Sequence, residues 1–199
     1  MTDPGTVRPG GRTAQVRESV LRTVGDMVAD RGFDALELPV VAERAGVGKT
    51  TLYRRWGSAS ALVSDLLVEM AASSRPRADT GSLRGDLTAN AALVVDTLGY
   101  ARQGRLFRAM FAAAAADPTT AEALATFYAV RVTEWAPCVD DAILRGEAPA
   151  GTDAHEVIRA VSAPLYYRFL TTLTPPDGDD ADRAVAVVLA AVAAGAFTA

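Results

Sequence analysis

The segment VVAERAGVGKTTLYRRW (residues 40–56) contains two short helical patterns separated by a glycine. Gly46 lies between them and can adopt the left-handed backbone conformation that a tight turn requires. Apolar residues on both sides of the turn are spaced to pack against one another. They are Val41, Ala42, Ala45, Val47 and Leu52. This pattern predicts a helix-turn-helix unit.

The outer face of the second helix is left with small polar, aromatic and basic side chains. A short exposed helix with these groups fits the major groove of DNA. We therefore predict a DNA-binding surface made of Gly48, Lys49, Thr50, Thr51, Tyr53, Arg54 and Arg55. Gly48 and Thr50 are small enough to approach base edges, and Lys49 and the other basic or aromatic members suit phosphate contacts. Leu52 and Trp56 are expected to hold this helix in the core of the unit.

The letters GVGKTT also resemble the end of a phosphate-binding loop of the form GxxxxGK[ST]. That loop needs a glycine five positions before Gly48, where this chain has Glu43, whose carboxylate would repel phosphate. The loop should also follow a buried strand, whereas residues 40–45 have helical spacing. The helix-turn-helix interpretation is therefore preferred. A plain helix pair with a solvated basic end is the remaining alternative from spacing alone.

Residues 42–56 and the following SASALVSDLL resemble the DNA-binding motif of TetR-type transcriptional repressors. The positions that match are Ala42, Ala45, Gly46, Val47, Thr51, Leu52, Tyr53, Ser58 and Leu62. The motif covers roughly residues 13–73, and APLYYRFL (residues 163–170) resembles a late helix of some family members. The resemblance implies an all-α chain in which an N-terminal DNA-binding unit precedes a helical ligand-binding and dimerisation domain.

Three departures from the family pattern concern local contacts. Gly48 stands where serine is usual, and Ala59 and Ser60 replace a Lys-Glu pair whose lysine often touches a phosphate in the family. Leu38 and Pro39 stand where serine or threonine often caps the first motif helix. Proline is accepted in a first helical turn, but the missing cap costs on the order of 1 kcal/mol.

The charge is divided unevenly along the chain. The net charge is −4, yet residues 1–57 hold nine basic and seven acidic residues and carry +2, whereas the remainder carries −6. The basic excess coincides with the motif, which supports nucleic acid as the partner of this part.

Helical periodicity and loop signals give three parts and about nine helices. Residues 1–12, rich in proline and glycine, are expected to form a disordered arm. Residues 13–57 form the predicted helix-turn-helix domain, with a first helix from about Thr13 to Arg31. Residues 58–199 form the helical regulatory domain. In it, one long helix is expected from about Thr119 to Arg145, with a kink at Pro137.

The last predicted helix, from about Asp179 to Phe197, is apolar on nearly every face. Such a surface cannot remain exposed to water. In the TetR-type family the last two helices of each subunit form a four-helix bundle with a partner. The resemblance therefore implies a homodimer joined through these helices, and the chain has no stretch expected to span a membrane.

Large apolar side chains between residues 83 and 135 stand in a region dominated by alanine. They are Phe107, Met110, Phe111, Phe127, Tyr128 and Trp135. Large groups among small ones can line a cavity, although an ordinary packed core explains them equally well. The family resemblance favours a pocket, and the scarcity of nearby polar residues suggests a small apolar or aromatic ligand.

The predicted function is that of a DNA-binding transcriptional regulator, a repressor released from a palindromic operator by a small ligand. The alternative is a helical dimer that carries small molecules or binds proteins without DNA. No cofactor or metal is expected, because His155 is the only histidine and Cys138 the only cysteine. No nucleophile motif supports an enzyme. The single cysteine fits a cytoplasmic protein.

Overall fold

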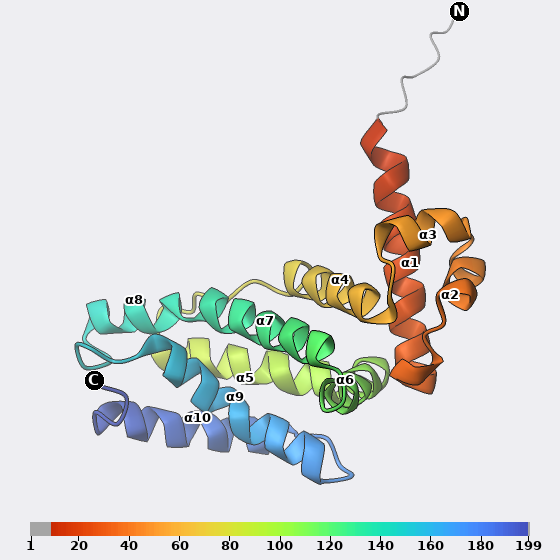
Figure 1. Cartoon of the computed structure of the whole chain (residues 1–199). Coiled ribbons are helices and arrows are strands. Elements are labelled where there is room, and N and C mark those ends of the chain that lie inside the picture. The colour runs from red at the N-terminus through yellow and green to blue at the C-terminus, as the bar shows by residue number, and fades with distance from the viewer. Residues whose placement is uncertain (1–8, 199) are drawn as a thin grey trace, which may run out of the picture.

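The computed structural model describes residues 9–198, which form helices joined by turns and short loops. The N-terminal helices are α1 (Pro9–Arg31), α2 (Leu38–Ala45) and α3 (Lys49–Arg55), with a 3-10 turn η1 (Phe33–Ala35) between α1 and α2. The buried stripe of α1 includes Val20, Val24 and Met27, as its helical spacing predicts. These three helices lie together at one end of the molecule (Figure 1). We call them the head.

The remaining helices form the body. They are α4 (Ala59–Ala72), α5 (Leu83–Gly99), α6 (Ala101–Ala114), α7 (Pro118–Trp135), α8 (Pro137–Arg145), α9 (Ala154–Thr171) and α10 (Gly178–Ala193). In Figure 1, α4 leads from the head along α7, while α9 and α10 lie on the other side of α5. The all-α fold class predicted from the sequence is confirmed.

The apolar core is divided into two clusters. One runs without interruption from α1 through α4 to α6 and α7, and includes Leu52, Leu66, Phe107 and Phe127. The other joins α5, α8, α9 and α10. Contiguous buried side chains therefore connect α6 and α7 to the head.

Two element boundaries differ from the prediction. The first helix begins at Pro9, so residues 9–12 are helical although they were assigned to a disordered arm, and residues 1–8 lie outside the described part. The long helix expected over residues 119–145 is two helices, α7 and α8, which meet at Ala136. Pro137 lacks the backbone N–H that would continue α7, so it begins a new helix instead of kinking the old one.

The apolar segment from Ala184 onward is largely contained in α10, where Ala184, Val185, Val188 and Val192 are buried against the body. Among the helices of residues 9–198, none combines the length and the apolar character needed to cross a bilayer.

Candidate DNA-binding surface and ligand cavity

The turn between α2 and α3 is built on Gly46. This residue has φ 68° and ψ 32°, the left-handed conformation that side chains with a Cβ rarely adopt. The backbone N–H of Gly46 donates to Glu43 O at 3.2 Å, and that of Val47 donates to Ala42 O at 2.9 Å. These bonds satisfy carbonyl groups at the end of α2 and fix the direction in which α3 begins.

The inner side of α3 is held by Leu52, which is fully buried. Val41 and Ala42 of α2 are buried in the same cluster, and Val47 packs against it. Glu37 precedes α2 without a side-chain cap, while Pro39 occupies its first turn, as the departures from the family pattern suggested. The two motif helices are therefore held by apolar packing and by the glycine turn.

The outer side of α3 carries the residues predicted to contact DNA. Gly48, Lys49, Thr50, Tyr53, Arg54 and Arg55 are exposed, and Thr51 is half-buried. Tyr53 is 48% exposed, a large apolar ring left in water. Neither Lys49 nor Arg54 has an ion-pair partner within the described residues 9–198. Such a surface is free to meet phosphates and base edges.

Arg55 lies closer to the protein than the other basic residues of the set. Its NH1 donates to Thr13 O at 3.5 Å, and its guanidinium carbon lies 4.9 Å from the centre of the Trp56 ring. Stacking on the indole orients the guanidinium while leaving it exposed. Arg55 thus connects the end of α3 to the start of α1.

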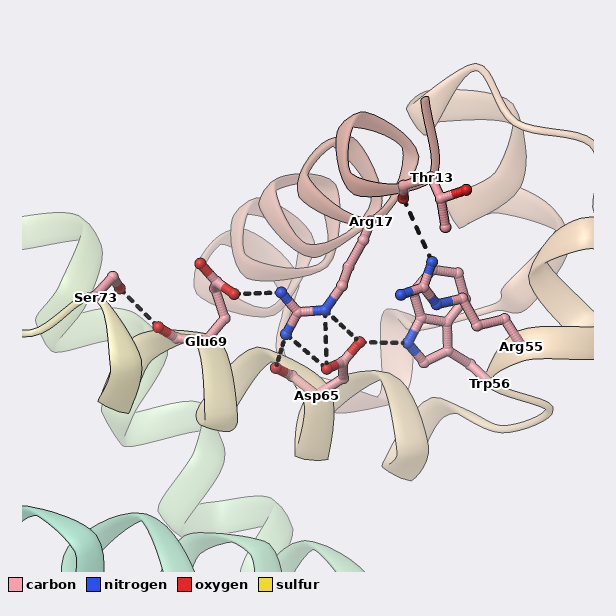
Figure 2. Close-up of polar contacts among 7 residues, drawn as sticks. All are labelled: Thr13, Arg17, Arg55, Trp56, Asp65, Glu69 and Ser73. Carbon is pink, nitrogen blue, oxygen red and sulfur yellow. Dashed lines mark hydrogen bonds and ion pairs between the residues drawn. The ribbon is translucent and has the colours of Figure 1, made fainter. Parts of the chain in front are cut away.

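The head is joined to α4 by a polar cluster of Arg17, Trp56, Asp65 and Glu69, which we call the Asp65 cluster. Arg17 of α1 donates to Asp65 Oδ1 from NH2 at 2.7 Å and also forms an ion pair with Glu69. Trp56 donates from Nε1 to Asp65 Oδ2 at 2.9 Å. Figure 2 shows the Arg17 guanidinium pointing between the two carboxylates of α4, with the indole on the far side of Asp65. One carboxylate therefore ties both α1 and the end of α3 to α4.

The charges in the Asp65 cluster favour its ionised form. Partial burial raises the pKa of the Asp65 carboxyl, but hydrogen bonds from Arg17 and Trp56 outweigh burial and leave the pKa below its ordinary value. Hydrogen bonds to Asp65 and Glu69 raise the pKa of Arg17. Asp65 and Arg17 are accordingly both charged at neutral pH.

Other polar contacts join the head to the body and the helices of the body to one another. Arg102 of α6 forms an ion pair with Asp26 of α1 at 2.7 Å. Ser60, which stands where the family usually has glutamate, donates to Asp117 Oδ2 at 2.9 Å. Asp117 caps α7 through the N–H of Thr120, so Ser60 ties the start of α4 to the start of α7.

A cavity of about 630 Å³ lies between α5, α6, α7 and α9. Of the six residues predicted to line a ligand pocket, it is lined by Phe107, Phe127, Tyr128 and Trp135. Met110 is buried in the core and Phe111 stacks on Tyr128 with centroids 6.0 Å apart, and neither lines this cavity. They lie away from it because α6 turns only one strip of its apolar face toward the cavity, and the ligand-binding role of all six residues stays a prediction.

The cavity is more polar than its sequence neighbourhood suggested. Asn90, Thr97 and Gln103 line it from α5 and α6, and Ser162 and Tyr166 line it from α9. Ser162 and Tyr166 were missed because α9 is distant in sequence from the aromatic residues, whereas Asn90, Thr97 and Gln103 lie within residues 83–135 and were not recognised as facing the cavity. Two signals could have found them: Asn90 interrupts the apolar face of its helix, and Ile158, Ser162 and Tyr166 recur every fourth residue.

The remaining candidates for chemistry have structural surroundings. Cys138 is fully buried, and burial raises the pKa of its thiol to about 12, so it is un-ionised at neutral pH. His155 is exposed in the first turn of α9, where the N–H groups of His155 and Glu156 donate to Asp153 Oδ1. Asp153 is therefore the predicted cap of that helix.

A helix-turn-helix whose second helix has an exposed basic face, joined to a larger helical body, is the arrangement of a DNA-binding regulator. Residues 26–66 match the family model of bacterial regulatory proteins of the tetR family. Residues 77–188 match the model of tetracyclin repressor-like C-terminal domains. The chain belongs to the TetR family of DNA-binding transcriptional regulators. Members of this family bind operator DNA, dimerise and bind small molecules, and they are not enzymes.

Individual relatives agree with this assignment. The chain is 30% identical over 176 residues to the HTH-type transcriptional regulator AqdR of Rhodococcus erythropolis, with 87% of this chain and 84% of that protein covered. It is 28% identical over 162 residues to the HTH-type transcriptional regulator YdeS of Bacillus subtilis, with 81% of each covered. The crystal structure of the TetR family transcription regulator SCO0332 superimposes with a TM-score of 0.71 at 26% identity, covering 89% of this chain and 98% of that one.

Proposed function

We propose that this protein is a homodimeric repressor whose two α3 helices enter successive major grooves of a palindromic operator, and that a ligand in the 630 Å³ cavity lowers its affinity for that operator. The single observation that carries the DNA-binding part is the outer face of α3. Its small, basic and aromatic residues are exposed while Leu52 anchors the helix from within. The site of action is the cytoplasm, where bacterial DNA lies.

The contact residues are divided by size and charge. Gly48 and Thr50 approach base edges, because a small side chain lets the helix come close to the groove floor. Lys49, Tyr53 and Arg54 contact phosphates, and Arg55 does so from its position on the indole of Trp56. Thr51, half-buried, serves either role. This division predicts that Gly48 and Thr50 determine which DNA sequence is preferred, while the other contact residues contribute affinity for any duplex.

The dimer interface is formed by α9 and α10. Their outer faces expose large apolar side chains that no element of the described chain covers, namely Tyr167, Leu170 and Val187, and Leu173 in the loop between the two helices is exposed as well. A groove of about 370 Å³ lies between the two helices, lined by Pro164, Tyr167 and Val187 among others. A second copy is the occupant that fits, because a self-complementary apolar face on the last two helices builds a twofold bundle.

The ligand acts through the contacts between head and body. It occupies the aromatic cavity between α5, α6, α7 and α9, which suits a small apolar or aromatic compound. Release of DNA requires that the ligand prefer a body in which the heads are spaced differently. The Asp65 cluster and the Arg102–Asp26 pair carry that difference to α1 and α3.

The experiment that tests the proposal is selection of binding sites from random duplex DNA with the full-length protein, followed by mobility shifts on the selected site. Recovery of an inverted repeat, bound by the wild type and lost on Lys49→Ala with Arg54→Ala, supports the proposal. Recovery of no enriched sequence, or binding that survives both substitutions unchanged, overturns it.

A further inference from the structure

One buried side-chain amide lines the cavity. Asn90 of α5 lines the cavity and is only 5% exposed. Ser162 of α9 donates from its hydroxyl to Asn90 Oδ1 at 3.2 Å, which fixes the amide across the gap between the two helices. The amide nitrogen of Asn90 makes no hydrogen bond within the described residues 9–198. The amide therefore keeps unused N–H donors at the cavity, and an acceptor on a bound molecule would complete its hydrogen bonding there.

The walls around this amide are aromatic. The side chains of Phe127 and Tyr128 meet edge to face with centroids 5.2 Å apart, and Tyr128 meets Tyr166 in the same way at 5.2 Å. Phe107 and Trp135, both buried, line the cavity as well. Rings at these angles accommodate a flat aromatic group by stacking and edge contacts.

The charges around the cavity cancel one another. Among the described residues no aspartate or glutamate lines it, so a cationic ligand would find no counter-charge there. Three arginines do line it, but Arg75, Arg131 and Arg159 are each paired with a carboxylate, namely Asp96, Glu134 and Glu156. An ion moved from water into this cavity loses hydration without gaining an unpaired counter-charge, so binding of a charged ligand is disfavoured.

From these observations we infer that the effector is an uncharged aromatic compound with an oxygen acceptor, and that Asn90 donates to this oxygen. The inference rests on the proposed ligand function of the cavity and specifies its ligand class. Ser162 is a positioning residue, because it holds Oδ1 of Asn90 and turns the amide N–H groups toward the remaining space. The aromatic part of the ligand lies among Phe127, Tyr128 and Tyr166.

Four biphenyls of nearly equal shape test the inference: 4-acetylbiphenyl, 4-isopropylbiphenyl, biphenyl-4-carboxylate and biphenyl-4-carboxamidinium. Their dissociation constants are measured by equilibrium dialysis against the full-length dimer. The acetyl compound is expected to bind about tenfold more tightly than the isopropyl compound, which lacks the acceptor, and more tightly than either ion. Isopropyl or ionic compounds binding as tightly as the acetyl compound would overturn the inference, and so would the absence of binding by all four.

Two variants separate the amide from general cavity effects. In Asn90→Leu the acetyl and isopropyl compounds are expected to have about equal dissociation constants, because the donor is gone while the apolar volume of the side chain remains. In Thr97→Val, another lining position on α5, the preference is expected to persist, because the Thr97 hydroxyl already donates to Leu93 O at 2.7 Å. A preference that survives Asn90→Leu contradicts the assignment of the donor.

DNA binding is measured separately on the same preparations by mobility shift on the selected operator. Operator binding with the wrong order of biphenyl affinities rejects only the ligand class. Loss of operator binding by the wild type rejects the proposed regulatory function whatever the biphenyls do. The wild-type order of affinities decides the inference even when Asn90→Leu fails to fold.

Discussion

The indole N–H of Trp56 donates to Asp65 Oδ2 at 2.9 Å, and the same carboxylate receives Arg17 of α1. Trp56 is the residue that ends α3, and Asp65 lies in the middle of α4. The orientation of the predicted DNA-binding helix is therefore tied directly to the first helix of the body (Figure 2). A shift of α4 relative to α1 would strain both bonds to this carboxylate.

Asp65→Asn is expected to destabilise the protein by about 1–2 kcal/mol, because Arg17 would lose the more buried of its two carboxylate partners and keep only Glu69. The side chains of Arg17 and Asp65 are only 24% and 25% exposed. Chemical denaturation measures the change. The matched control is Asp96→Asn, which breaks the ion pair with Arg75. The side chains of Arg75 and Asp96 are 68% and 60% exposed, so this variant is expected to lose less than about 0.5 kcal/mol of stability. Equal losses in the two variants would contradict the importance of the Asp65 cluster.

The contribution of Asp65 to the stability of the fold should decrease as the pH falls. Its folded pKa is lowered from the ordinary value of 3.8, so the folded state favours the ionised form. The stabilisation is complete well above pH 3.8 and is lost as the pH falls through the lower folded pKa. The stability difference between wild type and Asp65→Asn is therefore expected to be constant near neutral pH and to shrink in acid. A stability difference that grows as the pH falls would contradict a lowered pKa for Asp65 in the folded state.

The same replacement at two nearby glycines should have opposite effects on stability. Gly46→Ser is expected to cost about 1 kcal/mol, because φ at this position is 68°. Gly48→Ser is expected to be neutral or to stabilise by a few tenths of a kcal/mol, because Gly48 has φ −65° and caps α3, a position that serine favours. An added Cβ at Gly48 meets only Thr51 Oγ1 at 3.9 Å. Thermal unfolding of both variants measures the two changes in stability. Equal losses of stability would contradict the different roles assigned to Gly46 and Gly48.

Lys49→Ala should weaken binding to all duplex sequences and reduce the slope of log affinity against log salt by about one unit. The exposed Arg84 at the start of α5 provides the control, since Arg84→Ala removes the same charge outside both the head and the proposed dimer face. Mobility shifts over a range of salt concentrations measure both slopes. A slope unchanged by Lys49→Ala, or changed equally by Arg84→Ala, would reject the phosphate contact.

Val187→Glu should dissociate the dimer, because it places a charge in the apolar face proposed to join two copies. Sedimentation velocity at micromolar concentration is expected to show a monomer, with operator affinity lower by at least about tenfold because two linked heads are no longer presented together. Leu144→Glu on α8 is the control, since Leu144 is also exposed but lies outside α9 and α10. A Val187→Glu dimer would place the interface elsewhere.

The parts of the structure that were predictable from sequence are local. Gly46, Leu52 and the short apolar repeats around them specify α2, the turn and α3 within a single window of residues. Helix periodicity did not show that α7 ends at Ala136, because the same apolar spacing continues past Pro137.

The parts that could not be predicted are long-range pairs. Arg17 and Asp65 are 48 residues apart, and Asn90 and Ser162 are 72 apart, so no local pattern joins them. Phe107 and Phe111 are one helical turn apart on α6 and were both expected in the cavity. Only the packing of α6 against α7 and α9 determines that Phe107 lines it and Phe111 lies against Tyr128 and Tyr166 instead.

Hydroxyl-radical footprinting of the selected operator tests most directly whether a symmetric pair of α3 helices enters DNA. Two protected segments related by a twofold axis, with centres about one helical turn apart or slightly more, are the expected result. Protection of both segments should disappear together in Val187→Glu, which removes the partner. A single unpaired protected segment, or protection that is independent of the dimer, would contradict the proposed mode of binding.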